Sequence, residues 1–249
     1  FGDDLPMAQH PHIRSTEACY RSSALAVELA RRHGTRLHVL HLSTEKELAL
    51  FEPGPPDEKK ITAEVCVHHL WFCDQDYPRL GHRIKCNPAI RQASDRDALV
   101  QGVLDGRIDI IATDHAPHTL AEKRNPYFKS PSGLPLIQHA LVLLLEKYHQ
   151  GLFNLELIAE KYAHAPARLF QITDRGYVRE GYWADLTLVD LDRPWTVAPD
   201  NIHHKCGWSP FEGLTFRSRV ESTIVSGQVA WHNGSIDPSV RGQRLRFTR

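Results

Sequence analysis

Three short apolar runs, each followed by polar residues, constrain the fold of this chain more than any other feature. The runs occupy residues 36–41, 61–67 and 108–113, and helical patterns at 15–32 and 95–104 precede the first and the third. Strands separated by helices form parallel βα units, because a parallel pairing needs a crossover that returns the chain to the same end of the sheet. The pattern therefore predicts an α/β fold with a parallel sheet.

The residues at the ends of these strands are the first candidates for chemistry. The strands end at His41, in the region 66–69, and at Asp114. In a TIM-like (β/α)8 barrel the carboxyl ends of the strands carry the active site. Three strands cannot close such a barrel, and an open sheet of three would expose its edges. We therefore expect the chain to be part of a larger barrel.

After about residue 172 the sequence changes to short strands joined by turns, which predict a small β domain. We accordingly predict two domains, a partial barrel over residues 1–172 and the β domain over 173–249. The remaining predicted elements are helices at 134–149 and 155–162 and strands at 175–181, 184–190 and 220–227.

Composition excludes several classes of protein. The 30 Lys and Arg balance the 30 Asp and Glu, so no basic excess is present to bind nucleic acid or a membrane surface. The longest apolar run, 140–145, is far too short to span a bilayer. The five cysteines are odd in number and scattered, which predicts reduced thiols. With neither a signal nor a transit peptide after Phe1, we expect a cytoplasmic protein.

The run 112–123 carries the strongest chemical signal. An apolar strand ends at Asp114, and His115, His118 and Lys123 follow within one turn-rich segment. A carboxylate at a strand end can bind a metal and also accept a proton. The alternative is that Asp114 caps the next helix and the histidines are solvated loop residues.

This run resembles the signature of dihydroorotases in the amidohydrolase superfamily: Gly or Ala, Ser or Thr, Asp, any residue, Ala-Pro-His, four residues, Lys. Residues 112–123 match it at every defined position. Segment 37–44 resembles the family's sixth barrel strand, and 62–70 resembles the seventh, with Val67 where the family usually has Pro. Segment 85–91 resembles the family's Asn-Pro-Pro-Leu-Arg loop, with Ala89 and Ile90 as conservative departures.

The resemblance covers nearly the whole chain and implies the fold, the reaction and the site. The fold would be strands six to eight of a TIM-like (β/α)8 amidohydrolase barrel followed by a small β-sandwich. The reaction would interconvert L-dihydroorotate and N-carbamoyl-L-aspartate in pyrimidine synthesis. His41 and Asp114 would bind zinc, with two zinc ions in the complete protein, and Asp114 would carry the proton. Asn87, His118 and the backbone near Gly133 would bind the substrate.

Other polar residues receive structural interpretations. We expect Glu64 to be paired, because a buried carboxylate needs a partner. Arg91 has two readings, an ion pair with Asp95 or Asp97 and a contact with substrate. The remaining assignments are Lys123 as a residue that orders its loop, His68 and His69 as structural, and His10 and His12 as loop residues despite their metal-like spacing.

Part of the family's machinery has no match here. The first-strand His-x-His-x-Arg motif, the bridging ligand and the strand-five histidine are absent from the strand ends, and we expect them to precede Phe1. The chain alone would then be inactive. Two alternatives remain open: another cyclic amidohydrolase such as an allantoinase or hydantoinase, and a non-catalytic dihydroorotase-like scaffold. The resemblance also leaves a homodimer and association with aspartate transcarbamoylase as partner hypotheses.

Overall fold

A computed structural model describes residues 5–248, so the start of the chain at Phe1 lies outside the described residues. The described residues form two compact units. One comprises the residues up to Ala140 together with Ile202–Glu212, and the other comprises Leu141–Asn201 and the residues from Gly213 on.

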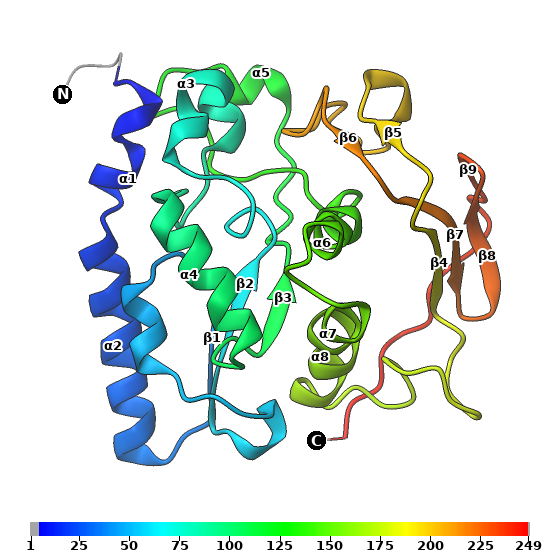
Figure 1. Ribbon diagram of the computed structural model, residues 1–249, viewed down its shortest axis with the longest axis horizontal. Helices are drawn as coiled ribbons and strands as arrows, with labels where there is room; N and C mark the ends of the chain where they lie inside the picture. Colours follow the sequence, from blue (N-terminus) through cyan, green and yellow to red (C-terminus); the bar gives the residue numbers. More distant parts are fainter. Residues whose placement is uncertain (1–4, 249) are drawn as a thin grey trace. The chain divides into compact units, whose positions relative to one another are not determined.

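The first unit is built on a parallel sheet of the order β1-β2-β3, as predicted (Figure 1). The strands are β1 (Leu37–Val39), β2 (Ile61–Cys66) and β3 (Ile110–Ala112). His38 pairs with Thr62 across the first interface, and Cys66 pairs with Ala112 across the second. All three carboxyl ends therefore lie at one edge of the sheet.

Two long helices of this unit also follow the sequence pattern. Helix α2 (Thr16–His33) begins where the Ser15 hydroxyl accepts a hydrogen bond from the amide of Ala18 at 3.2 Å, and it ends at Gly34 with φ 63°. Helix α4 (Ala93–Leu104) packs closely, because a Cβ at Gly102 would lie 2.8 Å from the Leu48 side chain. The shorter helices of this unit are η1 (Met7–Gln9), α1 (His10–Ile13), η2 (Lys46–Leu50), η3 (Pro56–Glu58), η4 (Asp74–Asp76), α3 (Tyr77–Leu80), η5 (Gly81–Ile84) and α5 (Leu120–Lys123).

The second unit combines helices with an antiparallel sheet of the order β4-β7-β8-β9. A further antiparallel pair joins β5 to β6. The elements are α6 (Ala140–His149), α7 (Leu155–Ala159), the π-helix η6 (Glu160–His164), α8 (Ala165–Leu169), β4 (Leu186–Asp190), β5 (Trp195–Thr196), η7 (Pro199–Asn201), β6 (Thr215–Phe216), β7 (Arg219–Val225), β8 (Gln228–His232) and β9 (Ser235–Ile236).

Two predicted elements are corrected. Residues 175–181 form turns rather than a strand, with Gly176 and Gly181 both at φ 83°, a backbone conformation incompatible with a strand. The helix predicted from residue 134 begins only at Ala140, because Leu134 instead bridges His115 and accepts a hydrogen bond from the amide of Ala116.

The fold class is confirmed as mixed α/β with a parallel and an antiparallel sheet. Strands β1 to β3 do not close a barrel among residues 5–248, so the complete barrel stays a prediction. Helices α6, α7 and α8 belong to the same compact unit as the antiparallel sheet. The predicted boundary between barrel and β domain near residue 172 stays a prediction. The five cysteines are free, and no helix within the described part is long and apolar enough to cross a membrane.

One face of the parallel sheet carries a row of polar side chains along β2. Side chains alternate along a strand, so Thr62, Glu64 and Cys66 share a face, and register places His38 beside Thr62 on it. Glu64 is buried and accepts a hydrogen bond from Nε2 of His38 at 3.0 Å and from the amide of His41 at 3.4 Å. The expectation that Glu64 is paired is confirmed.

A buried lysine ties together the loops beyond the sheet. The Nζ atom of Lys123 donates to the carbonyl oxygens of Lys85, Pro131 and Gly133 at 2.9–3.0 Å, and the side chain is 1% exposed. Burial lowers the pKa of Lys123 to about 8. Lys123 therefore orders its loop, as predicted, and also joins it to the loop that begins at Lys85.

His10 plays a comparable role nearer the amino terminus. It is buried in helix α1, so its assignment to a loop is wrong. Its Nε2 contacts the carbonyl oxygen of Cys86 at 2.8 Å, and its Nδ1 contacts the hydroxyl of Tyr127 at 2.7 Å. A carbonyl only accepts, so Nε2 donates and the neutral ring accepts from Tyr127. Burial lowers the pKa of His10 to about 4.

Arg91 is also buried and bound to backbone. Its guanidinium donates to the carbonyl oxygens of Pro11, at 3.0 Å, and of Arg14. The Asp95 carboxylate instead accepts from the amide of Glu45 at 2.9 Å. Among the described residues Arg91 therefore positions the segment before α2. The ion pair with Asp95 or Asp97, one of its two readings, is not formed there, since Asp97 pairs with Arg96.

We predict that the protein loses stability in mild acid partly through His10. Its folded-state pKa lies below the ordinary value of about 6.5, so its contribution is fully present above about pH 6.5 and is lost as the pH falls toward about 4. The loss is at most about 1.4 kcal/mol per pH unit for this group. Urea unfolding at a series of pH values should show a shallower pH dependence for His10→Gln. If the unfolding free energy changed equally with pH in the wild type and in His10→Gln, the prediction would be contradicted.

We predict that Lys123→Met loosens the loops as well as the fold. The change leaves three buried carbonyl oxygens without their charged donor, and one such hydrogen bond contributes about 1.5–3 kcal/mol. The unfolding free energy should fall by roughly 2–4 kcal/mol in a denaturant titration. Lys129→Met, at an exposed position of the same loop, is the control and should change stability by less than about 0.5 kcal/mol. An unfolding free energy that is unchanged in Lys123→Met would show that the lysine does not stabilise these loops.

Candidate functional site

His41 and Asp114, the two predicted metal ligands, share an unusual backbone conformation. His41 follows β1 with φ 40°, and Asp114 follows β3 with φ 47°. Left-handed backbone is uncommon for residues other than glycine, and such positions concentrate at functional sites because the surrounding structure must hold them. The sharp turn at each strand end therefore marks the same two residues as the sequence pattern does.

These two residues lie at one edge of the sheet, on either side of β2. Two strand spacings separate β1 from β3, about 10 Å between backbones. Asp114 is exposed and His41 is half-buried, so both side chains are accessible from that edge. An imidazole and a carboxylate with no thiolate fit a catalytic zinc site, which leaves positions for further ligands.

His118 and Gly133, two predicted substrate-binding residues, are in direct contact. A Cβ at Gly133 would lie 2.5 Å from the Ala116 Cβ and 3.1 Å from Cδ2 of His118, and the φ of 142° also requires glycine. The carbonyl of His118 accepts a hydrogen bond from Nε1 of the buried Trp208 at 2.8 Å. Glycine at residue 133 thus allows the two loops to approach closely.

His115, which the signature leaves undefined, fixes the same loop. Its Nδ1 accepts hydrogen bonds from the amides of Leu136 at 2.9 Å and Ile137 at 3.2 Å. Burial lowers the pKa of His115, which favours the neutral ring that can accept these bonds.

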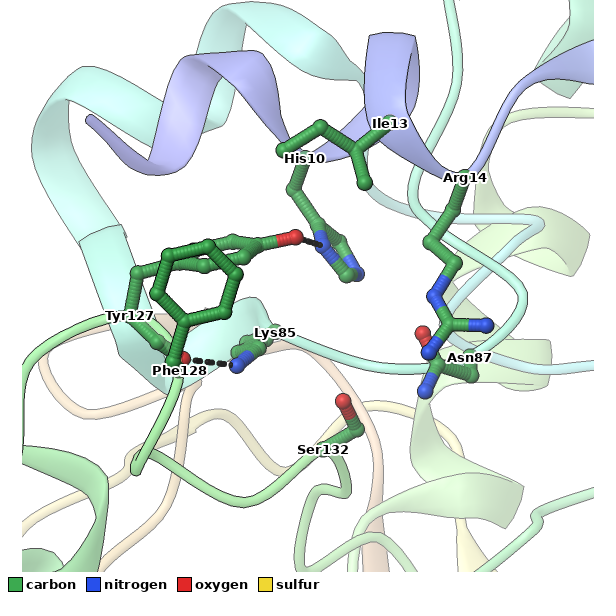
Figure 2. A pocket seen from close by; sticks show the side chains of 8 residues that line it. All are labelled: His10, Ile13, Arg14, Lys85, Asn87, Tyr127, Phe128 and Ser132. Carbon is green, nitrogen blue, oxygen red and sulfur yellow. Dashed lines mark hydrogen bonds between the residues drawn. The ribbon is translucent and has the colours of Figure 1, made fainter. Parts of the chain in front are cut away.

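Asn87 lines a cavity of about 320 Å³, whose wall also includes Ser132, the neighbour of Gly133 in the chain (Figure 2). Its side chain is exposed, and Figure 2 shows it beside the guanidinium of Arg14. The amide of Gly133 donates to the carbonyl of Lys85 at 2.8 Å, which connects the Asn87 loop to the Gly133 loop. The cavity is lined by His10, Ile13, Arg14, Lys85, Asn87, Tyr127, Phe128 and Ser132.

Sequence reasoning missed most of this cavity wall. Arg14 follows His10 and His12, which were assigned to a loop, and Lys85 begins the motif that contains Asn87. Tyr127 had no signal in the sequence at all. Its hydroxyl is bound to His10 and its carbonyl to Lys85, contacts that join segments about 40 to 120 residues apart.

His68 and His69, assigned structural roles, lie in the turn after β2 and are fully buried. His69 contacts the carbonyl of Pro88 through Nε2 at 3.1 Å. His68 forms no hydrogen bond through either ring nitrogen among the described residues.

The sequence comparisons agree with the strand-end pattern. Residues 7–230 match the amidohydrolase family. The chain is 36% identical over 209 residues to the dihydroorotase of Anoxybacillus flavithermus, which covers 84% of this chain and 49% of the relative. It is 33% identical over 243 residues to the dihydroorotase of Pyrococcus furiosus, covering 98% and 56%. The chain spans about half the length of these curated relatives.

Solved structures show the same fold. The L-hydantoinase (dihydropyrimidinase) of Arthrobacter aurescens superposes with a TM-score of 0.82 at 26% identity, over 91% of this chain and 51% of the other. A D-hydantoinase structure superposes with a TM-score of 0.83 at 21% identity, over 94% and 52%. The family match extends across both compact units, and the resemblance seen in the sequence is confirmed: the chain belongs to the amidohydrolase family and has dihydroorotases among its relatives.

Proposed function

We propose that the protein containing this chain is a dihydroorotase, which interconverts L-dihydroorotate and N-carbamoyl-L-aspartate. The observation that carries the proposal is the placement of His41 and Asp114, with left-handed backbone, at the same edge of the parallel sheet. Asp114 also begins the signature that the chain shares with dihydroorotases, and dihydroorotases are its curated relatives at 33–37% identity.

Zinc is the metal that this donor set favours. His41 would supply an imidazole nitrogen and Asp114 a carboxylate oxygen, with the other ligands outside the described residues. When bound, zinc polarises an amide carbonyl and makes water a competent nucleophile at neutral pH. The fit rests on the nitrogen and oxygen donors and on their accessibility at the strand edge.

We assign proton transfer and substrate binding to residues of this chain. The Asp114 carboxylate accepts the proton of the attacking water and returns it to the ring nitrogen as the amide bond breaks. His118 and the Gly133 backbone hold one side of the substrate, and their contact keeps both in place. Asn87 binds a polar edge of the substrate, and the nearby Arg14 guanidinium offers a partner for its carboxylate.

Hydrolysis of another cyclic amide is the second candidate, because the L-hydantoinase superposes on 91% of this chain. Turnover of dihydroorotate, allantoin and dihydrouracil by the intact protein separates the candidates. We expect kcat/KM for dihydroorotate to exceed the others by at least about tenfold, since a site that pairs the carboxylate discriminates against substrates that lack one. A preference for dihydrouracil would favour the second candidate, and no turnover of any of them would indicate a scaffold.

In the intact protein we predict that Asp114→Asn abolishes most of the activity while the fold remains. The amide cannot accept the proton, and general acid–base catalysis contributes roughly 10²–10⁴-fold to a rate. Steady-state kinetics should show kcat lower by about that factor. Asp105→Asn, at the end of α4 that precedes β3, is the matched control and should keep near-normal kcat. Normal turnover by Asp114→Asn would exclude it as the proton carrier.

We predict that Asn87→Ala and His118→Ala impair substrate binding more than metal binding. Both are proposed to touch substrate and not zinc, so KM should rise while zinc content is unchanged. Elemental analysis alongside kinetics makes the test, with His41→Ala as the comparison that should lose zinc. Zinc loss in Asn87→Ala or His118→Ala, together with retention in His41→Ala, would reverse this division of roles.

A further inference from the structure

The end of β2 and the turn behind it bring together three potential metal ligands. Cys66, His68 and His69 each offer one donor atom, all of these atoms lie within 4.8 Å of one another, and all three side chains are buried. The amides of His69 and Leu70 donate to the carbonyl of Cys66 at 2.9 and 3.4 Å. The chain therefore folds back on itself, which returns the two histidine rings to the thiol.

His68 lacks the partners that a buried imidazole normally has. Its side chain is 1% exposed, and neither ring nitrogen has a hydrogen-bond partner among the described residues; Nδ1 of His69 has none either. An unsatisfied buried polar group costs about 1–3 kcal/mol, so such groups are usually paired. His10 in the same unit satisfies both of its nitrogens. A metal ion at the cluster would supply the missing partner.

The protonation states of the two histidines suit metal binding. Burial lowers the pKa of His69 to about 3 and lowers that of His68 well below its ordinary value. Both rings are therefore neutral near pH 7, with a nitrogen lone pair available. Burial, and then the nearby Glu64 and Asp114 carboxylates, raise the pKa of the Cys66 thiol, so zinc has to displace the thiol proton to solvent when it binds.

We propose that Cys66, His68 and His69 together bind one zinc ion, through ligands other than His41 and Asp114. One thiolate and two imidazoles suit zinc, at about 2.3 Å from sulfur and 2.0–2.1 Å from nitrogen. Tetrahedral geometry at these lengths separates the ligand atoms by roughly 3.5 Å, so binding draws the side chains inward by about 1 Å. Water takes the fourth position. The proposal does not depend on the proposed reaction, because it uses none of the residues assigned to it.

X-ray absorption at the zinc edge tests the proposal on the intact protein, loaded with zinc and freed of excess. We expect a zinc–sulfur distance of about 2.3 Å. Cys66→Ser should lose this distance and one zinc ion per chain by elemental analysis. Cys86→Ser is the matched control and should keep both, because Cys86 is equally buried but its thiol donates to the carbonyl of Pro88 at 3.1 Å, outside the cluster.

A second variant tests the histidines. His68→Phe should weaken zinc binding at the sulfur-containing site by at least about tenfold in competition with a chelator, with circular dichroism to confirm folding. Unchanged affinity would overturn the proposal. So would a zinc–sulfur distance that persists in Cys66→Ser or that disappears in Cys86→Ser instead. Absence of the distance from the wild-type protein would overturn it whether or not any variant folds.

Discussion

Parallel pairing of β1, β2 and β3 is the constraint on which the candidate site depends. Because the three strands run in the same direction, their carboxyl ends meet at one edge, and residues that lie 25 to 73 positions apart in the chain become neighbours there. His41 and Asp114 leave their strands through left-handed backbone, while Cys66 ends the strand between them. In an antiparallel arrangement the strand ends would alternate between opposite ends of the sheet, so these groups would not lie together.

Three buried basic side chains organise the loops above this edge through backbone carbonyl oxygens, with no carboxylate partner within residues 5–248. Lys123, Lys85 and Arg91 each donate to backbone carbonyl oxygens of segments distant in the sequence. Carbonyl acceptors compensate part of the desolvation of a buried cation, and burial still lowers the pKa of Lys123 and Lys85. The loops that carry Asn87 and Gly133 are thus joined by backbone contacts. The positions of Asn87 and Gly133, which are proposed to bind substrate, therefore depend on these buried cations.

The local elements were predictable where one strong signal dominated. Ser15 and Gly34 mark the two ends of α2 to within one residue, and the three apolar runs became β1, β2 and β3. Prediction failed where glycine or a long-range contact decided the outcome. The 175–181 run was predicted as a strand but is bent at its glycines, and Leu134 is held outside α6 by its bridge to His115. Neither the bridge nor its partner can be read from the sequence around residue 134.

The sequence by itself determined the α/β pattern, the family resemblance and the identity of His41, Asp114, Asn87 and His118 as candidates, because these depend on local periodicity and on contiguous motifs. Only the tertiary structure decided which groups meet. It placed His10 in the interior, because both ring nitrogens find partners about 75 and 115 residues away. It also gathered Cys66, His68 and His69 into one buried cluster, since a turn that folds back behind a strand is a property of the chain in three dimensions and not of its residue types.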